Sequence, residues 1–335
     1  MILVPESNLQ KAAIKHYEYF RAKHLADFKV ECQTTTLRGR ELKFLKILLR
    51  LHKTIIIGNT AQLAKLNHII ELFKERNPII CMRLKQKKSK LYKTINKVFD
   101  YNKFVQSYFP LWGAYALCKE LELDVCPYCN RQYISVLYTK KNDAKTRPDL
   151  DHFFDKETHP YFALSLYNLV PCCKICNSSF KHSKKFDLDN YLHPFTEGFG
   201  NDLTFSVSFT KAFEHRDKWN LNLYYGSSPE FELTLKERPG ANKGLLKRAK
   251  NNAKVFKIVE IYNFHKDIIF EIIQKSIVYN EEMIKDIYNR HSKLFSSEDE
   301  VWKMIMGNYL NESELSKRPL AKCVKDVSKE LGLLK

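Results

Sequence analysis

Apolar and polar positions follow a helical period through the first third of the chain. Between residues 42 and 51, apolar side chains crowd a segment of helix length that basic residues precede and interrupt. A second helix is predicted over residues 62–75, where apolar residues recur three and four positions apart. These residues are Leu63, Leu66, Ile69, Ile70 and Phe73. The pattern predicts a helical N-terminal domain over residues 1–120.

The period changes in the middle of the chain, where paired cysteines, aromatic residues and prolines accompany runs that resemble strands. The later runs predict a small antiparallel sheet with a Gly-Ser-Ser-Pro turn at residues 226–229, and from about Asn242 the helical period returns. The strand-like runs cover residues 132–138, 149–154, 203–209, 220–225 and 230–235. We therefore predict an α+β chain. A central module over residues 121–198 follows the N-terminal helices, and a small sheet with a helical C-terminal region spans residues 199–335.

The net charge of the chain indicates which class of partner it binds. The 335 residues include 56 Lys+Arg against 38 Asp+Glu, a formal net charge of +18. Such a surplus favours a polyanionic partner, and nucleic acid above an acidic protein or a membrane surface. Residues 83–97 are basic throughout and contain no acid, so they form either a solvated face or a phosphate-contacting patch. The predicted nucleic-acid contacts in the two helical regions are Lys87, Lys88, Lys247 and Arg248.

The cysteines point to a metal. No apolar run approaches the length of a membrane span, and the first residues carry no apolar stretch of the signal-peptide kind. Nine cysteines make an odd number, which argues against a framework built only of disulfides. We expect a cytoplasmic protein with no membrane partner, in which clustered cysteines bind metal.

Two Cys-x-x-Cys pairs predict where that metal binds. Cys126 and Cys129 form one pair, Cys173 and Cys176 form the other, and a long segment separates them. Each pair can present two thiolates to one tetrahedral ion, so the two together predict a structural zinc site. The alternative is four buried cysteines with this spacing by chance. Cys172 is left out, because only Cys173 stands at Cys-x-x-Cys spacing from Cys176.

A set of polar residues accompanies the cysteine pairs. Asp151 and His152 are adjacent within a strand-like run, and Asn168 stands before Leu-Val-Pro. Asn177 directly follows the last cysteine of the pairs, and Lys181 stands four residues after it. Each signal alone is weak, since an asparagine in such a position commonly caps a turn. Together, within the Cys-x-x-Cys frame, they resemble the HNH endonuclease motif in its zinc-bound form.

The resemblance covers roughly residues 126–194. Two segments within it, residues 126–129 and 166–171, also resemble HNH proteins that stand beside ATPases in bacterial anti-phage systems, including retron and Septu types. It implies a ββα-metal (HNH) core with a structural zinc site of four cysteines. In that core a strand hairpin carries Asp151 and His152, and a helix runs from about Cys173 to Lys185.

The resemblance also implies roles for these residues. Phosphodiester hydrolysis needs a water nucleophile, neutralisation of developing negative charge and help for the leaving oxygen. His152 would be the general base, because imidazole ordinarily titrates near physiological pH. Asp151 and Asn177 would ligate one Mg²⁺ or Mn²⁺, and Asn168 would orient the loop and the His152 ring. Lys181 is either a phosphate contact or a solvated helix lysine.

Three readings of function follow. The first is a metal-dependent endonuclease that hydrolyses nucleic acid, above all DNA, as the effector of an anti-phage system. The second is a non-catalytic, zinc-dependent nucleic-acid-binding module in which Asp151 and His152 are incidental. The third is a subunit that stays latent until a partner ATPase releases it. Many HNH proteins have histidine where this chain has Asn177, and the nearby His159, His182 and His193 are expected to be structural or surface residues.

Overall fold

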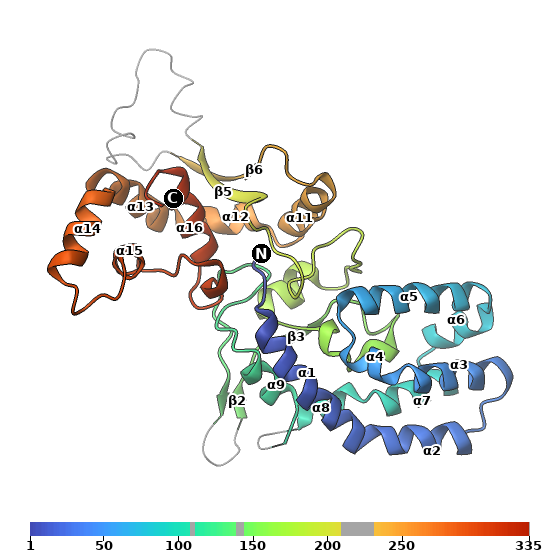
Figure 1. Ribbon diagram of the computed structural model, residues 1–335. Coiled ribbons are helices and arrows are strands. Elements are labelled where there is room, and N and C mark those ends of the chain that lie inside the picture. The colour runs from blue at the N-terminus through green and yellow to red at the C-terminus, as the bar shows by residue number, and fades with distance from the viewer. Residues whose placement is uncertain (108–110, 139–143, 209–230, 335) are drawn as a thin grey trace. The chain divides into compact units, whose positions relative to one another are not determined.

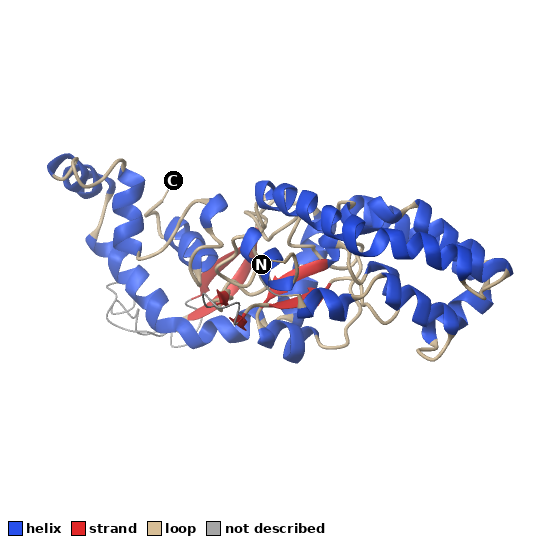
Figure 2. Cartoon of the chain, turned by 90° about the horizontal axis from the view of Figure 1, so that it is seen from below, coloured by secondary structure: helices blue, strands red, loops and turns tan. Residues whose placement is uncertain are grey.

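The computed structural model describes residues 1–107, 111–138, 144–208 and 231–334 (Figure 1). The described part is α+β and mostly helical, with short antiparallel strand pairs (Figure 2). No helix within these ranges combines the length and the apolar character that crossing a membrane requires.

The chain forms two compact units that alternate along the sequence. We call them the N-terminal unit, Val4–Leu123 with Ile134–Thr196, and the C-terminal unit, Met1–Leu3 with Asp124–Tyr133 and Glu197–Lys335. The N-terminal helices therefore share a unit with most of the predicted central module.

Helices build most of the N-terminal unit. The two helices predicted from periodicity are confirmed as α3 (Gly39–Arg50) and α5 (Thr60–Glu75). α5 begins at a capping box, in which Asn59 and Gln62 each accept a hydrogen bond from the other's backbone N–H at 2.9 Å. The other α-helices among its described residues are α1 (Glu6–Phe20), α2 (Ala26–Thr34), α4 (His52–Ile57), α6 (Pro78–Lys85), α7 (Lys90–Val98), α8 (Tyr101–Gln106) and α9 (Ala114–Glu120).

Two strand pairs complete this unit. β3 (Asp149–His152) pairs antiparallel with β4 (Leu169–Cys172), in a register that sets Asp149 opposite Cys172 and His152 opposite Leu169. β1 (Leu137–Tyr138) pairs with β2 (Ala144–Thr146). The strand predicted over residues 132–138 is therefore confirmed only in its last two residues.

Among its described residues, the C-terminal unit contains the strand pair β5–β6 and a run of helices. β5 (Leu203–Ser208) pairs antiparallel with β6 (Glu232–Glu237), which confirms two of the predicted strands. The predicted strand at residues 220–225 and its turn lie outside the described residues. The expected return to helix is confirmed by α11 (Lys243–Val255), α12 (Ile258–Tyr262), α13 (Lys266–Val278), α14 (Glu281–Arg290), α15 (Glu298–Met306) and α16 (Ala321–Glu330).

Acidic side chains of α16 bind backbone groups of β5. Asp326 accepts a hydrogen bond from the Phe205 N–H at 3.0 Å, and Glu330 accepts one from the Val207 N–H at 2.9 Å. These two N–H groups would otherwise be unpaired donors on the strand that β6 covers on one side only. α16 thereby supplies hydrogen-bond acceptors for backbone N–H groups at the edge of β5 that β6 does not cover.

Candidate active site and cysteine cluster

The four predicted cysteines form a cluster. The sulfur atoms of Cys126, Cys129, Cys173 and Cys176 all lie within 4.8 Å of one another, and all four residues are buried. A Zn–S length of about 2.3 Å places tetrahedral sulfurs about 3.8 Å apart, so this cluster can hold a structural ion such as zinc. Cys172 is not a member of the cluster, as the spacing predicts. It lies buried in β4, where burial raises the pKa of its thiol well above the ordinary value.

Local backbone turns bring each pair of thiols together. In the first pair, the Asn130 N–H donates to the Cys126 carbonyl at 2.7 Å, and Asn130 has a positive φ of 51° that an asparagine tolerates better than most residues. In the second pair, the Cys176 N–H points at the Cys173 sulfur at 3.4 Å. An N–H donor of this kind stabilises negative charge on sulfur, the form that binds metal.

The β3 strand presents two carboxylates on one side. Asp149 and Asp151 are two residues apart, so they share a face, while His152 points to the other. The Asn177 amide nitrogen lies 3.1 Å from an Asp149 carboxylate oxygen. The Lys181 ammonium lies 2.7 Å from an Asp151 oxygen. The segment that follows β4 therefore folds back onto this face of β3.

That segment differs from the predicted helix. The expected α-helix over residues 173–185 is a shorter π-helix, η4 (Ile175–Lys181). It ends at His182, whose φ of 46° and ψ of −117° no helix accommodates. The His182 N–H donates to the Asn177 carbonyl at 2.9 Å, an i→i+5 bond of the π type. Both π turns and strained non-glycine residues concentrate at functional sites.

The His152 ring is held from two sides. Its Nε2 lies 3.0 Å from the Ala163 carbonyl oxygen, and the Tyr101 ring of α8 meets it edge-on with centroids 4.5 Å apart. Because a carbonyl only accepts, Nε2 carries the proton and Nδ1 keeps its lone pair. Burial, and next the nearby Lys156 ammonium, lower the pKa of His152 to about 3. The imidazole is therefore neutral at physiological pH, with a pKa well below the ordinary value that sequence reasoning assigned to it.

Asn168 joins the ends of the long connection between β3 and β4. Its side-chain oxygen accepts a hydrogen bond from the Phe154 N–H at 2.6 Å. Its amide donates to the carbonyls of Phe154 and Phe162, both at 3.0 Å. The residue is fully buried, so these three bonds satisfy its whole amide group. They anchor the backbone next to His152 and next to Ala163, the carbonyl partner of His152.

A cavity of about 330 Å³ collects most of these residues. Its wall combines three carboxylates, four cationic side chains, two histidines and an amide. The lining residues are Tyr101, Arg147, Asp149, Leu150, Asp151, His152, Asp155, Lys156, Asn177, Lys181, His182, Ser183 and Lys184. Among the residues predicted to form the catalytic site, Asn168 does not line the cavity.

Sequence reasoning missed several of these side chains. Asp149 carries a readable signal, because it stands two residues before Asp151 in the same strand and so shares its face. Arg147 and Lys156 flank that strand in sequence. Tyr101 comes from the helical region, and nothing in its local pattern links it to His152.

The predicted nucleic-acid contacts fall in different surroundings. Lys181 is 3% exposed, so it is not the solvated lysine that was one of its two expected roles. It lines the cavity, and its expected role as a phosphate contact stays a prediction. Lys87 forms an exposed ion pair with Glu157 at 2.7 Å, and Lys88 is exposed. In the C-terminal unit, Lys247 is exposed and Arg248 binds both carboxylate oxygens of Glu197.

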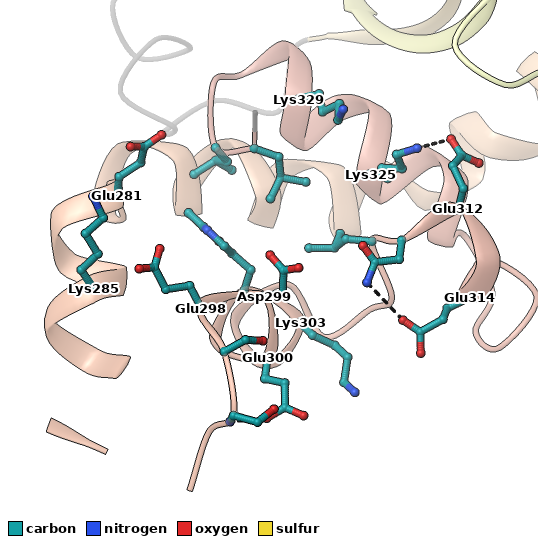
Figure 3. Close-up of a pocket in the computed structure, with 17 residues that line it drawn as sticks. Glu281, Lys285, Glu298, Asp299, Glu300, Lys303, Glu312, Glu314, Lys325 and Lys329 are labelled. Carbon is teal, nitrogen blue, oxygen red and sulfur yellow. Dashed lines mark hydrogen bonds and ion pairs between the residues drawn. The ribbon is translucent and has the colours of Figure 1, made fainter. Parts of the chain in front are cut away.

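A larger cavity of about 640 Å³ lies within the C-terminal unit, among α14, α15 and α16 (Figure 3). Two interactions join polar side chains of its lining. Lys325 pairs with Glu312, and the Asn311 amide donates to Glu314 at 3.4 Å. None of its lining residues is a histidine or a cysteine. It therefore lacks the imidazole and thiol groups that the smaller cavity and the cysteine cluster contain.

The chain matches no protein-family model, and no curated protein or solved structure is detectably similar to it. The likeness of its motif to HNH endonucleases stays a prediction.

Proposed function

We propose that this chain is a metal-dependent endonuclease of the HNH kind that hydrolyses phosphodiester bonds in nucleic acid, above all DNA. One observation carries the proposal. A neutral histidine with its Nδ1 lone pair free of the Ala163 carbonyl lines the same cavity as Asp149, Asp151 and Asn177. A base beside oxygen ligands is the combination that metal-assisted hydrolysis needs.

His152 supplies the base. The Ala163 carbonyl holds the Nε2 proton, so Nδ1 accepts the proton of the attacking water. The Tyr101 ring packs edge-on against the imidazole and limits its rotation. A bound phosphate would place negative charge near the ring, which raises its pKa toward the working range of a general base.

Carboxylate and amide oxygens supply the metal ligands. The cavity offers Asp149 and Asp151 of β3 and Asn177 of η4, a hard oxygen donor set that suits Mg²⁺ or Mn²⁺. Such an ion, when bound, neutralises charge on the phosphate and the leaving oxygen. The chain's own part is to hold these oxygens at the cavity that His152 also lines.

Basic side chains supply substrate binding. Arg147 precedes β3, Lys156 follows it, and both line the cavity. Lys156 is exposed, with its ammonium 4.9 Å from the Tyr101 ring centroid. We assign both residues to phosphates of the bound strand, in keeping with the net charge of +18.

Regulation by a partner is the second part of the proposal, and it rests on the resemblance to HNH proteins that stand beside ATPases. Within the part of the chain that the structure describes, we identify no element that reads base sequence. An unrestrained nuclease of this kind would cut its host's own DNA. We propose that the chain stays latent until a partner ATPase of an anti-phage system releases it.

A plasmid-cleavage assay tests the activity. Purified protein is compared with His152→Ala in Mg²⁺ or Mn²⁺, with and without EDTA. His68→Ala is the matched control, because His68 is an exposed histidine of α5 outside the cavity. Alone or after addition of the partner ATPase, wild type and His68→Ala should cleave the plasmid, and His152→Ala or EDTA should abolish that cleavage.

Zinc content is measured in each sample, so that loss of the structural ion is not mistaken for loss of the catalytic one. Cleavage that survives His152→Ala would refute the assigned base. Zinc-dependent DNA binding without cleavage under any partner or metal condition would favour the non-catalytic module.

A further inference from the structure

The carboxylates that line the smaller cavity are not equivalent. Asp155 already accepts hydrogen bonds from the backbone N–H groups of Glu157, at 3.1 Å, and Thr158, at 3.2 Å. Its second oxygen also accepts from the Thr158 hydroxyl at 3.1 Å. These bonds, acting against burial, lower the pKa of Asp155. Asp155 therefore serves the turn that follows β3, and its oxygens face that turn.

The Asp151 carboxylate forms a buried ion pair with Lys181. The Lys181 ammonium lies 2.7 Å from its carboxylate, with side-chain exposures of 4% for the lysine and 6% for the aspartate. The same ammonium donates to the His152 carbonyl at 2.7 Å and lies 5.0 Å from the Phe186 ring centroid. Lys181 is thus enclosed by an anion, a carbonyl and an aromatic face.

A divalent cation bound directly to Asp151 would have to share its carboxylate with this ammonium. Breaking a buried ion pair by removing one partner is costly, because the other charge stays desolvated. Placing a divalent ion beside a retained ammonium adds repulsion that is strong in a buried site. Both effects disfavour Asp151 as the metal ligand while Lys181 holds its position.

Among the described residues, Asp149 forms neither the turn hydrogen bonds of Asp155 nor an ion pair like that of Asp151 with Lys181. It is half-buried on the same face of β3, and its carboxylate lies 3.1 Å from the Asn177 side-chain nitrogen. Rotation of that amide turns its oxygen toward Asp149, so the two side chains can offer two oxygens to one ion. A site with two protein oxygens suits Mg²⁺ or Mn²⁺, which fill the rest of their shell with water and substrate phosphate.

We propose that Asp149 and Asn177 are the protein ligands of the catalytic divalent ion, and that Lys181 is a permanent counter-ion that keeps Asp151 out of the coordination shell. The assignment rests on the proposed function and replaces Asp151 in the ligand pair. Lys181 is then a positioning residue, because its bonds to Asp151 and to the His152 carbonyl tie η4 to the end of β3.

Mn²⁺ binding tests the assignment without a cleavage assay. The full, zinc-loaded chain is titrated with Mn²⁺, and free Mn²⁺ is followed by electron paramagnetic resonance, to which zinc is silent. We expect Asp149→Asn and Asn177→Ala to weaken Mn²⁺ binding by more than about tenfold, the scale on which metal sites respond to loss of a supporting group.

The matched control removes the ion pair as a unit. Asp151→Asn combined with Lys181→Met leaves the net charge unchanged and strands no buried charge, so we expect it to weaken Mn²⁺ binding by a smaller factor than Asp149→Asn does. Zinc content and circular dichroism show whether each variant folds.

Two results would overturn the assignment. One is an Asp149→Asn variant that binds Mn²⁺ as wild type does while the charge-balanced pair variant loses binding. The other is a wild-type chain that binds no Mn²⁺. A wild-type chain that binds Mn²⁺ through Asp149 yet cuts no nucleic acid under any partner or metal condition would refute the proposed nuclease and leave the ligand assignment standing.

Discussion

His16 in α1 offers a quantitative test of how the helical region is held together. Its Nε2 lies 2.7 Å from the Leu164 carbonyl, and its Nδ1 accepts the Trp112 indole N–H at 3.1 Å. This arrangement fits only a neutral imidazole, because a second ring proton would point at the indole N–H. Burial is the main cause that lowers the pKa of His16 from 6.5 to about 4.

The pH dependence follows from the sign of that shift. At intermediate pH the unfolded chain carries the His16 proton and the folded chain does not, so lowering the pH favours unfolding. With pKa values of 6.5 unfolded and about 4 folded, His16 alone removes about 1.8 kcal/mol of stability between pH 7 and pH 5. The effect levels off below about pH 4, where both states are protonated.

The perturbation is His16→Gln, whose amide can still donate to Leu164 and accept from Trp112. The free energy of unfolding is measured by urea titration at pH 7 and pH 5, with Trp fluorescence as the signal. We expect the variant to lose about 1.8 kcal/mol less than wild type between these pH values. His68→Gln, on the exposed face of α5, should lose as much as wild type.

Other buried histidines contribute equally to both proteins, so the difference between them isolates His16. An identical loss in wild type and His16→Gln would refute the reasoning. It would mean that His16 titrates alike in the folded and unfolded states.

Three further predictions follow from the site. Metal analysis of Cys173→Ser should show loss of the bound zinc, while Cys172→Ser should keep it, because only the former belongs to the four-sulfur cluster. Asn168→Ala should destabilise the chain by about 3 kcal/mol in urea unfolding, because it leaves buried groups of Phe154 without partners, and an unchanged midpoint would contradict this. Lys156→Ala should weaken DNA binding for all sequences and reduce the salt slope by about 1 in fluorescence anisotropy, whereas an unaltered slope would exclude a phosphate contact.

Local pattern predicted much of the secondary structure. Apolar residues at helical spacing located α3 and α5, and alternation located β5 and β6, because each element buries one side against its neighbours. The π-helix after β4 has no such signature. Its i→i+5 winding depends on the contacts of Asn177 and Lys181 with β3, which local sequence does not encode.

Spacing also predicted which residues would meet. Two Cys-x-x-Cys pairs brought four sulfurs into one cluster, because a tight turn forces each pair together. The residues that resemble the HNH motif, apart from Asn168, line one cavity. Their catalytic roles stay predictions, and only the measurements above can decide them.

By itself the sequence determined the cysteine cluster, the strand carrying Asp151 and His152, and the helical character of both flanking regions, because periodicity and short-range spacing encode these. Only the tertiary structure decided that His152 is neutral, that Tyr101 of α8 packs against it, and that Lys181 is buried on Asp151. The physical reason is that desolvation and ion pairing depend on which distant segments exclude water from a side chain, and no local pattern specifies that.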